Sequence, residues 1–164
     1  AEGDLIRVDS STFPYRNTSG GDAGSWATYD PSTNLKNYFN FVDGGWWRDS
    51  WSWMYVQESA STVMQFKFNG TTIALDMLEC GECGQADIYL DGQLQQRVDS
   101  NAIENKQVRA FEKSGLEDGD HTLEIRGVDS EDKRYIRIAG FEFRHFEDPN
   151  AAKFWSEDTF FKAG

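Results

Sequence analysis

Hydrophobic and polar residues alternate with a period of two along several stretches of the chain. No stretch holds apolar residues at helical spacing over three turns. In residues 62–68 (TVMQFKF), for example, Met64, Phe66 and Phe68 fall on one side of an extended chain and polar or smaller residues fall on the other. This pattern predicts strands with one face in a core, and its recurrence predicts an all-β protein.

Turn residues separate the alternating stretches. Asn69-Gly70 predicts a hairpin or a tight corner after residues 62–68, and Asp91-Gly92 predicts a two-residue turn. A polar stretch containing residues 100–107 follows the second turn. In total the pattern predicts about eight strands, which suggests a β-sandwich of two antiparallel sheets. The further strands are expected within residues 71–78, 85–90, 107–114, 115–128 and 135–146.

The two ends of the chain are less regular than its middle. Residues 13–26 are rich in glycine and small polar residues and are expected to form an ordered loop, a kind of segment that often carries function. The aromatic residues of the tail, 148–164, predict that it packs back onto the sandwich. A length of 164 residues suits one domain, so we expect a single domain over residues 1–164.

The charge balance excludes some partners. Sixteen Lys and Arg face twenty-eight Asp and Glu, for a formal net charge of -12, and such a field repels phosphate backbones and anionic lipids. We therefore expect no nucleic acid and no membrane as partners. The sequence shows neither an apolar window of membrane-spanning length nor a basic flank followed by an apolar run at its start.

Cys80 and Cys83 form a C-x-x-C motif (CGEC). This spacing serves zinc sites, dithiol redox sites and small loop disulfides. Zinc would need two further ligands, and the two histidines, His121 and His145, lack finger spacing. A thioredoxin-like site would need an alternating strand and helix pattern. The simplest interpretation is a pair of cysteines that ties off or lines a turn, oxidised together if the protein is secreted.

The stretches FKFNGTTIALDM, ADIYLDGQ, GLEDGDHTLEIRG and IRIAGFEF resemble the galactose-binding-like jelly roll. This fold occurs in carbohydrate-binding modules joined to polysaccharide-degrading enzymes and in the accessory domain of some carbohydrate esterases. The resemblance covers about residues 40–145 and rests on turn and strand-start positions that match the family pattern: Gly70, Asp91, Gly92, Gly119, His121 and Thr122. It implies a secreted module, and it implies for His121 a structural hydrogen-bonding role rather than catalysis.

Calcium is the one cofactor that the resemblance suggests. Many relatives begin with an acidic strand that helps hold a structural calcium ion. Here the start, DLIRVDS, supplies Asp4 and Asp9 without that spacing. The acidic excess keeps structural calcium among the expectations, and the sequence names no ligand set for it.

Four of the six tryptophans fall within residues 46–53. In a strand from Trp51 onward, Trp51, Trp53 and Tyr55 would share one face, and a core position for Trp53 and Tyr55 is one interpretation. Trp46 and Trp47 instead follow Asp43-Gly44-Gly45, and Arg48 and Asp49 come directly after them. Burying all of these rings with those charges would be expensive. The segment therefore predicts a binding surface.

A sugar is the ligand class that suits such a surface. The apolar face of a pyranose stacks on an indole, and its hydroxyl groups bond to guanidinium and carboxylate groups. The predicted site is Trp46, Trp47, Arg48, Asp49 and Trp51, and Trp26 and Tyr29 from the early loop form a possible second wall.

We therefore expect a non-catalytic, monomeric module that binds a polysaccharide for an attached catalytic domain in a longer secreted chain. Enzyme motifs are scarce: no G-x-S-x-G elbow occurs, and two histidines leave little material for a Ser-His-Asp arrangement. Two alternatives stay open. The aromatic cluster could dock against another domain, or the chain could be a small polysaccharide lyase or glycosidase.

Overall fold

The computed structural model describes residues 3–9, 62–130, 132 and 135–146 with their side chains. For residues 24–30, 35–43, 47–48 and 55–58 it gives the course of the backbone strands. The described part contains twelve strands and no helix. Within that part, accordingly, no helix is long and apolar enough to cross a membrane.

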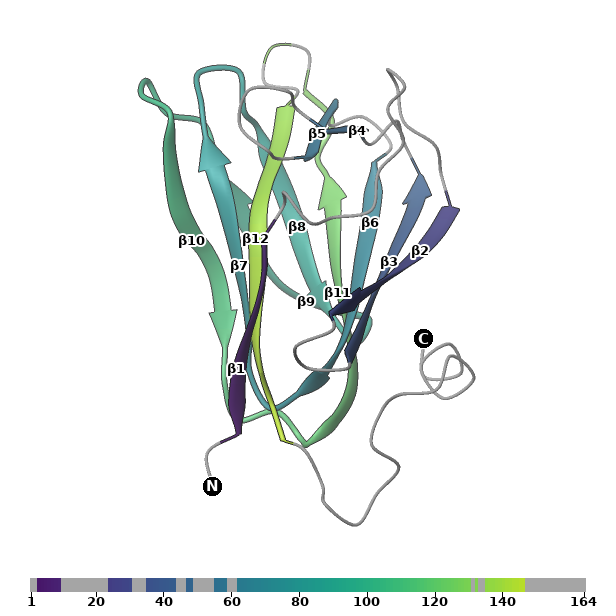
Figure 1. Ribbon diagram of the computed structural model, residues 1–164. Helices are drawn as coiled ribbons and strands as arrows, with labels where there is room; N and C mark the ends of the chain where they lie inside the picture. Colours follow the sequence, from purple (N-terminus) through teal and green to yellow (C-terminus); the bar gives the residue numbers. More distant parts are fainter. Residues whose placement is uncertain are drawn as a thin grey trace.

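The strands form two sheets that lie face to face, and every pairing between strands is antiparallel (Figure 1). Sheet A runs in the order β10 (Lys106–Lys113), β7 (Ile73–Glu79), β12 (Tyr135–His145), β5 (Tyr55–Glu58) and β4 (Trp47–Arg48), and β1 (Asp4–Asp9) also pairs with β12. Sheet B runs in the order β2 (Gly24–Asp30), β3 (Leu35–Asp43), β6 (Val63–Gly70), β11 (Gly119–Gly127), β8 (Gln85–Leu90) and β9 (Gln93–Asp99).

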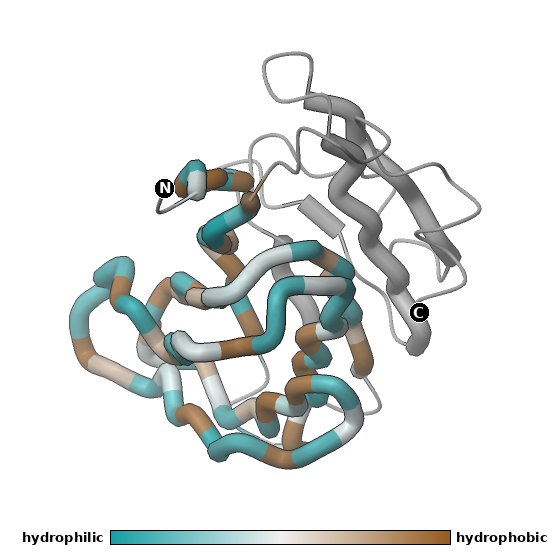
Figure 2. The backbone as a smooth tube through the Cα atoms, turned by 90° about the horizontal axis from the view of Figure 1, so that it is seen from below, coloured by the Kyte–Doolittle hydropathy of each residue, from teal (hydrophilic) through white to brown (hydrophobic). Residues whose placement is uncertain are grey.

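The core lies between the sheets, and the alternation along the strands fills it. Met64, Phe66 and Phe68 of β6 are fully buried, as predicted. The ring of Phe66 stacks on that of Phe141 of β12, with 4.1 Å between ring centroids, and so joins sheet B to sheet A. In Figure 2, hydrophobic and hydrophilic positions follow one another along the described strands.

Two turns show why the sequence folds in this way. Asp91 and Gly92 have φ angles of 51° and 83°, the left-handed values of a two-residue hairpin turn, and they join β8 to β9. After Gly70 the chain instead turns a corner from sheet B to sheet A. A side chain at Gly70 would place its Cβ 2.3 Å from the carbonyl oxygen of Arg144, so only glycine permits this approach.

These observations confirm the predicted all-β class and the sandwich of two antiparallel sheets. From β6 onward the chain passes from one sheet to the other at every connection except the β8–β9 hairpin, as in a jelly roll. The predicted number of strands was too low, because five strands precede β6. The loop predicted over residues 13–26 is wrong at its end, where β2 begins at Gly24. The tail, residues 148–164, lies outside the described residues, so its packing and the single domain over residues 1–164 stay predictions.

Candidate functional site

The predicted tryptophan segment reaches the edge of the sandwich. Trp47 and Arg48 form β4, the terminal strand of sheet A, and Trp26 and Tyr29 belong to β2, the terminal strand of sheet B. At the other edge of the sandwich, β9 and β10 are tied together by a bond from Lys113 Nζ to Gln95 Oε1 (2.8 Å). β4 and β2 therefore lie on the same edge, opposite β9 and β10.

Strand register sets the height of these residues along that edge. Trp47 pairs with Val56, which pairs with Arg137 of β12. Trp26 pairs with Phe39, which pairs with Phe66, the residue that stacks on Phe141. Arg137 and Phe141 are three ladder steps apart on β12, because a bulge lies between Ile138 and Gly140. The backbones of Trp47 and Trp26 therefore differ in height by about 10 Å.

The other predicted residues lie at another level of the sandwich edge or outside the described residues. Tyr29 pairs with Lys36 and lies further along β2, away from the level of Trp47. Trp46, Asp49, Trp51 and Trp53 lie outside the described residues. The platform as a whole thus stays a prediction. The structure gives strand positions for four of the predicted residues: Trp47, Arg48, Trp26 and Tyr29.

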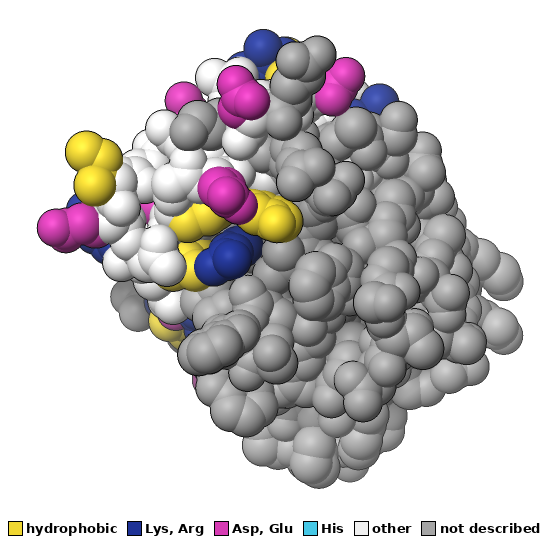
Figure 3. Space-filling view, turned by 90° about the horizontal axis from the view of Figure 1, so that it is seen from above, with side chains coloured by type: hydrophobic (Ala, Val, Ile, Leu, Met, Phe, Trp, Pro, Cys, Tyr) yellow, Lys and Arg dark blue, Asp and Glu magenta, His cyan; other side chains and the backbone are white. Residues whose placement is uncertain are grey.

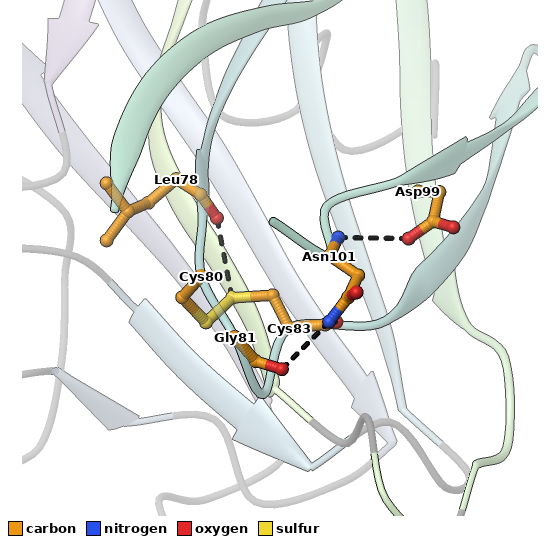
Figure 4. Close-up of a disulfide and its surroundings, with 6 residues drawn as sticks. All are labelled: Leu78, Cys80, Gly81, Cys83, Asp99 and Asn101. Atoms are coloured by element: carbon orange, nitrogen blue, oxygen red, sulfur yellow. Dashed lines mark hydrogen bonds between the residues drawn. A yellow bond between two sulfur atoms is a disulfide. The ribbon is translucent and has the colours of Figure 1, made fainter. Parts of the chain in front are cut away.

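A disulfide joins Cys80 and Cys83 in the loop between β7 and β8 (Figure 4). This confirms the turn-tying interpretation of the CGEC motif over zinc or a dithiol. The side-chain amide of Asn101 donates to the carbonyl oxygens of Gly81 (2.8 Å) and Cys83 (3.2 Å), and so holds the disulfide loop against the β9–β10 connection.

The disulfide loop lies at the same end of the sandwich as β4. Cys83 bridges to Tyr135 at the start of β12, and Tyr135 pairs with Glu58 at the end of β5, the strand that pairs with β4. Viewed from this end, the described surface shows acidic, basic and hydrophobic side chains in small separate groups (Figure 3).

A small cavity of about 190 Å³ lies near the disulfide loop, with Asp99, Asn101 and Asp129 among its lining residues. Asp99 already accepts a hydrogen bond from the backbone N–H of Asn101 (2.9 Å). Among the residues that the structure describes, no group of three or more His, Cys, Asp or Glu side chains could hold a metal ion. The described residues thus do not fit a carboxylate-rich calcium site.

The outer face of sheet A carries a network of ion pairs around Asp76 of β7. This carboxylate accepts hydrogen bonds from Arg7 of β1 and, at 2.8 and 3.3 Å, from Arg109 of β10. Arg109 also donates to Glu142 of β12 at 2.8 Å, and Arg7 donates to Asp9 at 2.7 Å. Four strands are thereby linked across one face.

Electrostatics explain how Asp76 stays charged although its side chain is only 8% exposed. Burial alone would raise the pKa of Asp76, but the hydrogen bonds and charges of Arg109 and Arg7 outweigh it and hold the pKa below its usual value. For the same reason the pKa of Arg109 is raised. Asp76 and Arg109 are therefore both ionised at neutral pH.

An open groove of about 450 Å³ runs beside this network on sheet A. Thr72, the residue before β7, and Ala74 of β7 line its floor, because Ala74 points away from the core. Glu112 and Lys113 of β10 lie along one side, and Glu142 and Arg144 of β12 lie along the other. No pattern in the sequence indicates this groove, since its walls come from strands far apart in the chain.

His121 has a structural role, as predicted. Its Nδ1 lies 2.6 Å from Oδ2 of Asp91 and its Nε2 lies 2.6 Å from the carbonyl oxygen of Glu117. Burial would lower the pKa of His121, but these two acceptors outweigh it and raise the pKa. The other oxygen of Asp91 accepts the N–H of Thr122 at 2.8 Å, so the histidine ties the β8–β9 turn to the chain before β11.

Comparisons with known proteins agree with this architecture. No family model matches the sequence. Among solved structures, a two-domain esterase active on acetylated mannans, co-crystallised with mannopentaose, matches with a TM-score of 0.52 and 14% identity over 87% of this chain and 37% of the esterase chain. A family two carbohydrate esterase from Cellvibrio japonicus matches with a TM-score of 0.51 and 9% identity, over 88% and 34% of the two chains.

The chain shares its fold with part of these esterases. The fold that the resemblance implied is thereby confirmed. Among curated proteins, the chain is 32% identical over 68 residues to an A type blood alpha-D-galactosamine galactosaminidase of Flavonifractor plautii. That match covers 42% of this chain and 6% of the galactosaminidase. The chain thus spans a small part of each of these proteins.

Proposed function

We propose that the chain is a non-catalytic module that binds a polysaccharide through a platform formed by Trp46, Trp47 and Trp51, with Arg48 and Asp49 bonding to sugar hydroxyl groups. The position of β4 carries this proposal. Among the strands that the structure describes, none pairs with the outer edge of β4, which supports the approach of a ligand to the tryptophan segment there. The fold shared with part of two carbohydrate esterases supports the same conclusion.

Trp26 and Tyr29 extend the proposed site along β2. Because the backbones of Trp26 and Trp47 differ in height by about 10 Å, a single sugar ring would not reach both. An oligosaccharide lying along the sandwich edge would. We therefore propose that the ligand is a chain of several sugars.

The proposed mechanism is adhesion. An attached catalytic domain would act on a polysaccharide that the module holds nearby, at a raised effective concentration. Each site would bind with modest affinity, because sugar hydroxyl groups exchange water hydrogen bonds for protein ones and only ring stacking adds a surplus. The small share of the esterases and of the galactosaminidase that the chain covers supports a parent chain with a catalytic domain.

A binding role without catalysis is consistent with how both histidines are used. His121 bonds to Asp91 and to Glu117, and Nδ1 of His145 lies 3.1 Å from the carbonyl oxygen of Asn69. The disulfide supports a secreted protein, since such bonds persist in oxidising compartments. We further propose that the module is monomeric. Structural calcium remains part of the proposal as a prediction.

The experiment that tests the function compares the retention of the 164-residue chain and of Trp47→Ala on an insoluble or gel-embedded polysaccharide. We expect the variant to lose retention while its melting temperature moves by only a few degrees. Leu94→Ala, which shortens an exposed side chain on β9 at the opposite edge, is the control and should be retained like the wild type. Full retention of Trp47→Ala would remove Trp47 from the site.

A further inference from the structure

We propose that the groove on the outer face of sheet A is a second binding site, which takes one ring of a neutral sugar. The carboxylates of Glu112 and Glu142 would accept hydrogen bonds from its hydroxyl groups. The groove lies on the sheet face rather than at the sandwich edge, so the inference does not depend on the tryptophan platform.

Strand register places the two glutamates on opposite sides of the groove. Glu112 of β10 pairs with Ala74 of β7, and Ala74 pairs with Glu142 of β12. In this row an alanine lies between two longer side chains, whose backbones are two strand spacings apart, or about 10 Å. The sheet is therefore hollow over Ala74. The groove that results, about 450 Å³, is within the range of small-molecule sites.

A register shift in β10 turns Glu112 toward the groove. Arg109 lies on the outer face, where it bonds to Asp76. In a regular strand the residue three positions later, Glu112, would point to the opposite face. The register shifts between Arg109 and Phe111, however, so Phe111 is buried in the core and Glu112 lies on the same face as Arg109.

A second register shift, in β12, does the same for Glu142. It lies between Ile138 and Gly140, and Ile138 is fully buried in the core. In a regular strand Glu142, four positions after Ile138, would also point into the core. Instead its Oε2 accepts a hydrogen bond from Arg109 on the outer face at 2.8 Å. Bulges re-aim side chains in this way and are over-represented beside active sites.

Both carboxylates can accept further hydrogen bonds. The side chain of Glu112 is 70% exposed, and its ion pair with Arg109 is long, with 3.7 Å from Nη1 to Oε2. Glu142 is held by Arg109 at Oε2 and lies 3.5 Å from Arg7 at Oε1, and its side chain is 22% exposed. Each carboxylate oxygen has two lone pairs, so a hydroxyl group can bond beside an arginine. The arginine contacts also fix Glu142, and a preformed site loses less conformational freedom on binding.

The other walls suit the ring of a sugar. The Thr72 hydroxyl, whose oxygen accepts the N–H of Arg144 at 3.0 Å, has its own proton to donate. The guanidinium of Arg144 donates from Nη1 to the carbonyl oxygen of Gly3 at 3.1 Å and keeps further N–H donors. Leu5 of β1 lines the groove with 54% of its surface exposed, which gives the C–H face of a ring an apolar contact.

The charge balance of the groove favours a neutral ligand. Lys113 borders the groove, but its Nζ donates to Gln95 of β9 in sheet B at 2.8 Å and so points away from it. The remaining charged residues of the lining are two arginines and two glutamates: Arg109, Arg144, Glu112 and Glu142. An anionic sugar would meet the two carboxylates, and a cationic sugar would meet the two guanidinium groups. A neutral sugar can use both through its hydroxyl groups, which donate and accept.

The test is an NMR titration of the isotope-labelled 164-residue chain. The neutral probes are gluco-, xylo-, manno- and galacto-oligosaccharides, and the charged probes are an oligogalacturonate and a chitosan oligosaccharide of the same length. We expect at least one neutral probe to shift the amide signals of Thr72, Ala74 and Ser114. Both charged probes should bind there at least tenfold more weakly.

Two variants test the walls of the groove. Ala74→Val fills the floor with a residue that strands favour, and should abolish these shifts. Its control, Ala102→Val, makes the same change in the β9–β10 connection and should behave like the wild type. Glu112→Ala should weaken binding of the neutral probe at least fivefold, whereas Glu104→Ala, which removes the same charge from an exposed site outside the groove, should not. Amide spectra of each variant report whether it is folded.

Three results would overturn the proposal. The first is an absence of shifts at Thr72, Ala74 and Ser114 with every neutral probe, a readout in the wild type that holds even if a variant fails to fold. The second is equal binding of a charged probe. The third is equal weakening by Glu112→Ala and Glu104→Ala, which would show an effect of net charge alone.

The failure of the groove and that of the tryptophan platform are distinguishable. Trp47→Ala should keep the groove shifts while it loses retention on the polysaccharide. Retention of the wild type without groove shifts would contradict only the second site. Groove shifts without any retention would contradict only the platform.

Discussion

Asp76→Asn is the substitution that tests the ion-pair network of sheet A. The side chain of Asp76 is 8% exposed, and its carboxylate accepts hydrogen bonds from arginines on both β1 and β10. Asparagine keeps the shape of the side chain but removes the charge and turns one acceptor into a donor. Two guanidinium groups would then face a neutral amide.

The magnitude follows from the contacts that are lost. A hydrogen bond to a charged group contributes roughly 1.5–3 kcal/mol, and Asp76 accepts three from Arg7 and Arg109. The loss is smaller than their sum, because the arginine side chains are 26% and 39% exposed to water and Arg109 keeps Glu142. We expect a fall of about 2–4 kcal/mol in the free energy of unfolding. For a chain of this size the melting temperature should fall by roughly 4–16 °C.

Urea unfolding followed by tryptophan fluorescence measures this change. The matched control is Asp87→Asn on sheet B, where Asp87 accepts two hydrogen bonds from Arg97, a side chain 55% exposed. We expect the control to cost less than about 1 kcal/mol, as exposed ion pairs do. A loss for Asp76→Asn no greater than that of the control would refute the reasoning.

The pH dependence gives a second readout of the same network. The pKa of Asp76 is lower in the folded than in the unfolded chain, where it is about 3.9. Its stabilising effect is therefore complete above pH 3.9 and is lost as the pH falls through the folded-state pKa. The difference in stability between wild type and Asp76→Asn should shrink in acid and vanish below that pKa.

Three further predictions concern His121, the disulfide and the contact between β1 and β12 at Gly140. The pKa of His121 is raised in the folded chain, so the stabilising effect of His121 is complete below about pH 6.5 and is lost as the pH rises through the folded-state pKa. His121→Asn should abolish this loss of stability at alkaline pH in thermal melts recorded from about pH 6 to 9. Replacing Cys80 and Cys83 by serine opens a four-residue loop and should lower the free energy of unfolding by roughly 2 kcal/mol, as measured in urea. An unchanged urea midpoint would contradict a stabilising role for the disulfide. Gly140→Ala would place a Cβ 2.8 Å from the carbonyl oxygen of Val8. We therefore expect a loss of about 1–3 kcal/mol in the free energy of unfolding and faster amide exchange in β1. An unchanged exchange rate would show that β1 tolerates the methyl group.

The sequence predicts best the strands that bury one face. In β6 and β8 every second residue enters the core, so the alternation is regular and the strands are recognisable. The Asp91-Gly92 turn is predictable for a related reason, because its left-handed backbone favours these two residue types.

Strands at the sheet edges escape prediction. β9, which follows the turn, buries only Val98, and its other residues are polar except for the exposed Leu94, so its sequence resembles part of a polar connection. β2 lies in a glycine-rich segment, and its position becomes recognisable only through its pairing with β3. An edge strand is held by main-chain bonds to one neighbour, which leave little trace in a hydrophobic pattern.

The sheet A network and groove depend on register in the same way. Arg7, Asp76, Arg109 and Glu142 come from four strands and meet only because these strands pair in a particular alignment. One sign was available in the sequence. A single aspartate within the otherwise apolar residues 73–78 of β7 indicates a buried charge, which requires a partner.

Native affinity electrophoresis of the 164-residue chain tests the central claim most directly. The gels would contain a panel of soluble plant-wall glucans, xylans, mannans and pectins and algal galactans, each with and without EDTA. We expect one polymer class to retard the chain, and loss of that retardation with EDTA would reveal a calcium site. Migration unchanged by every polymer, with tryptophan fluorescence also unchanged, would contradict polysaccharide binding and indicate that the tryptophan segment docks against another domain.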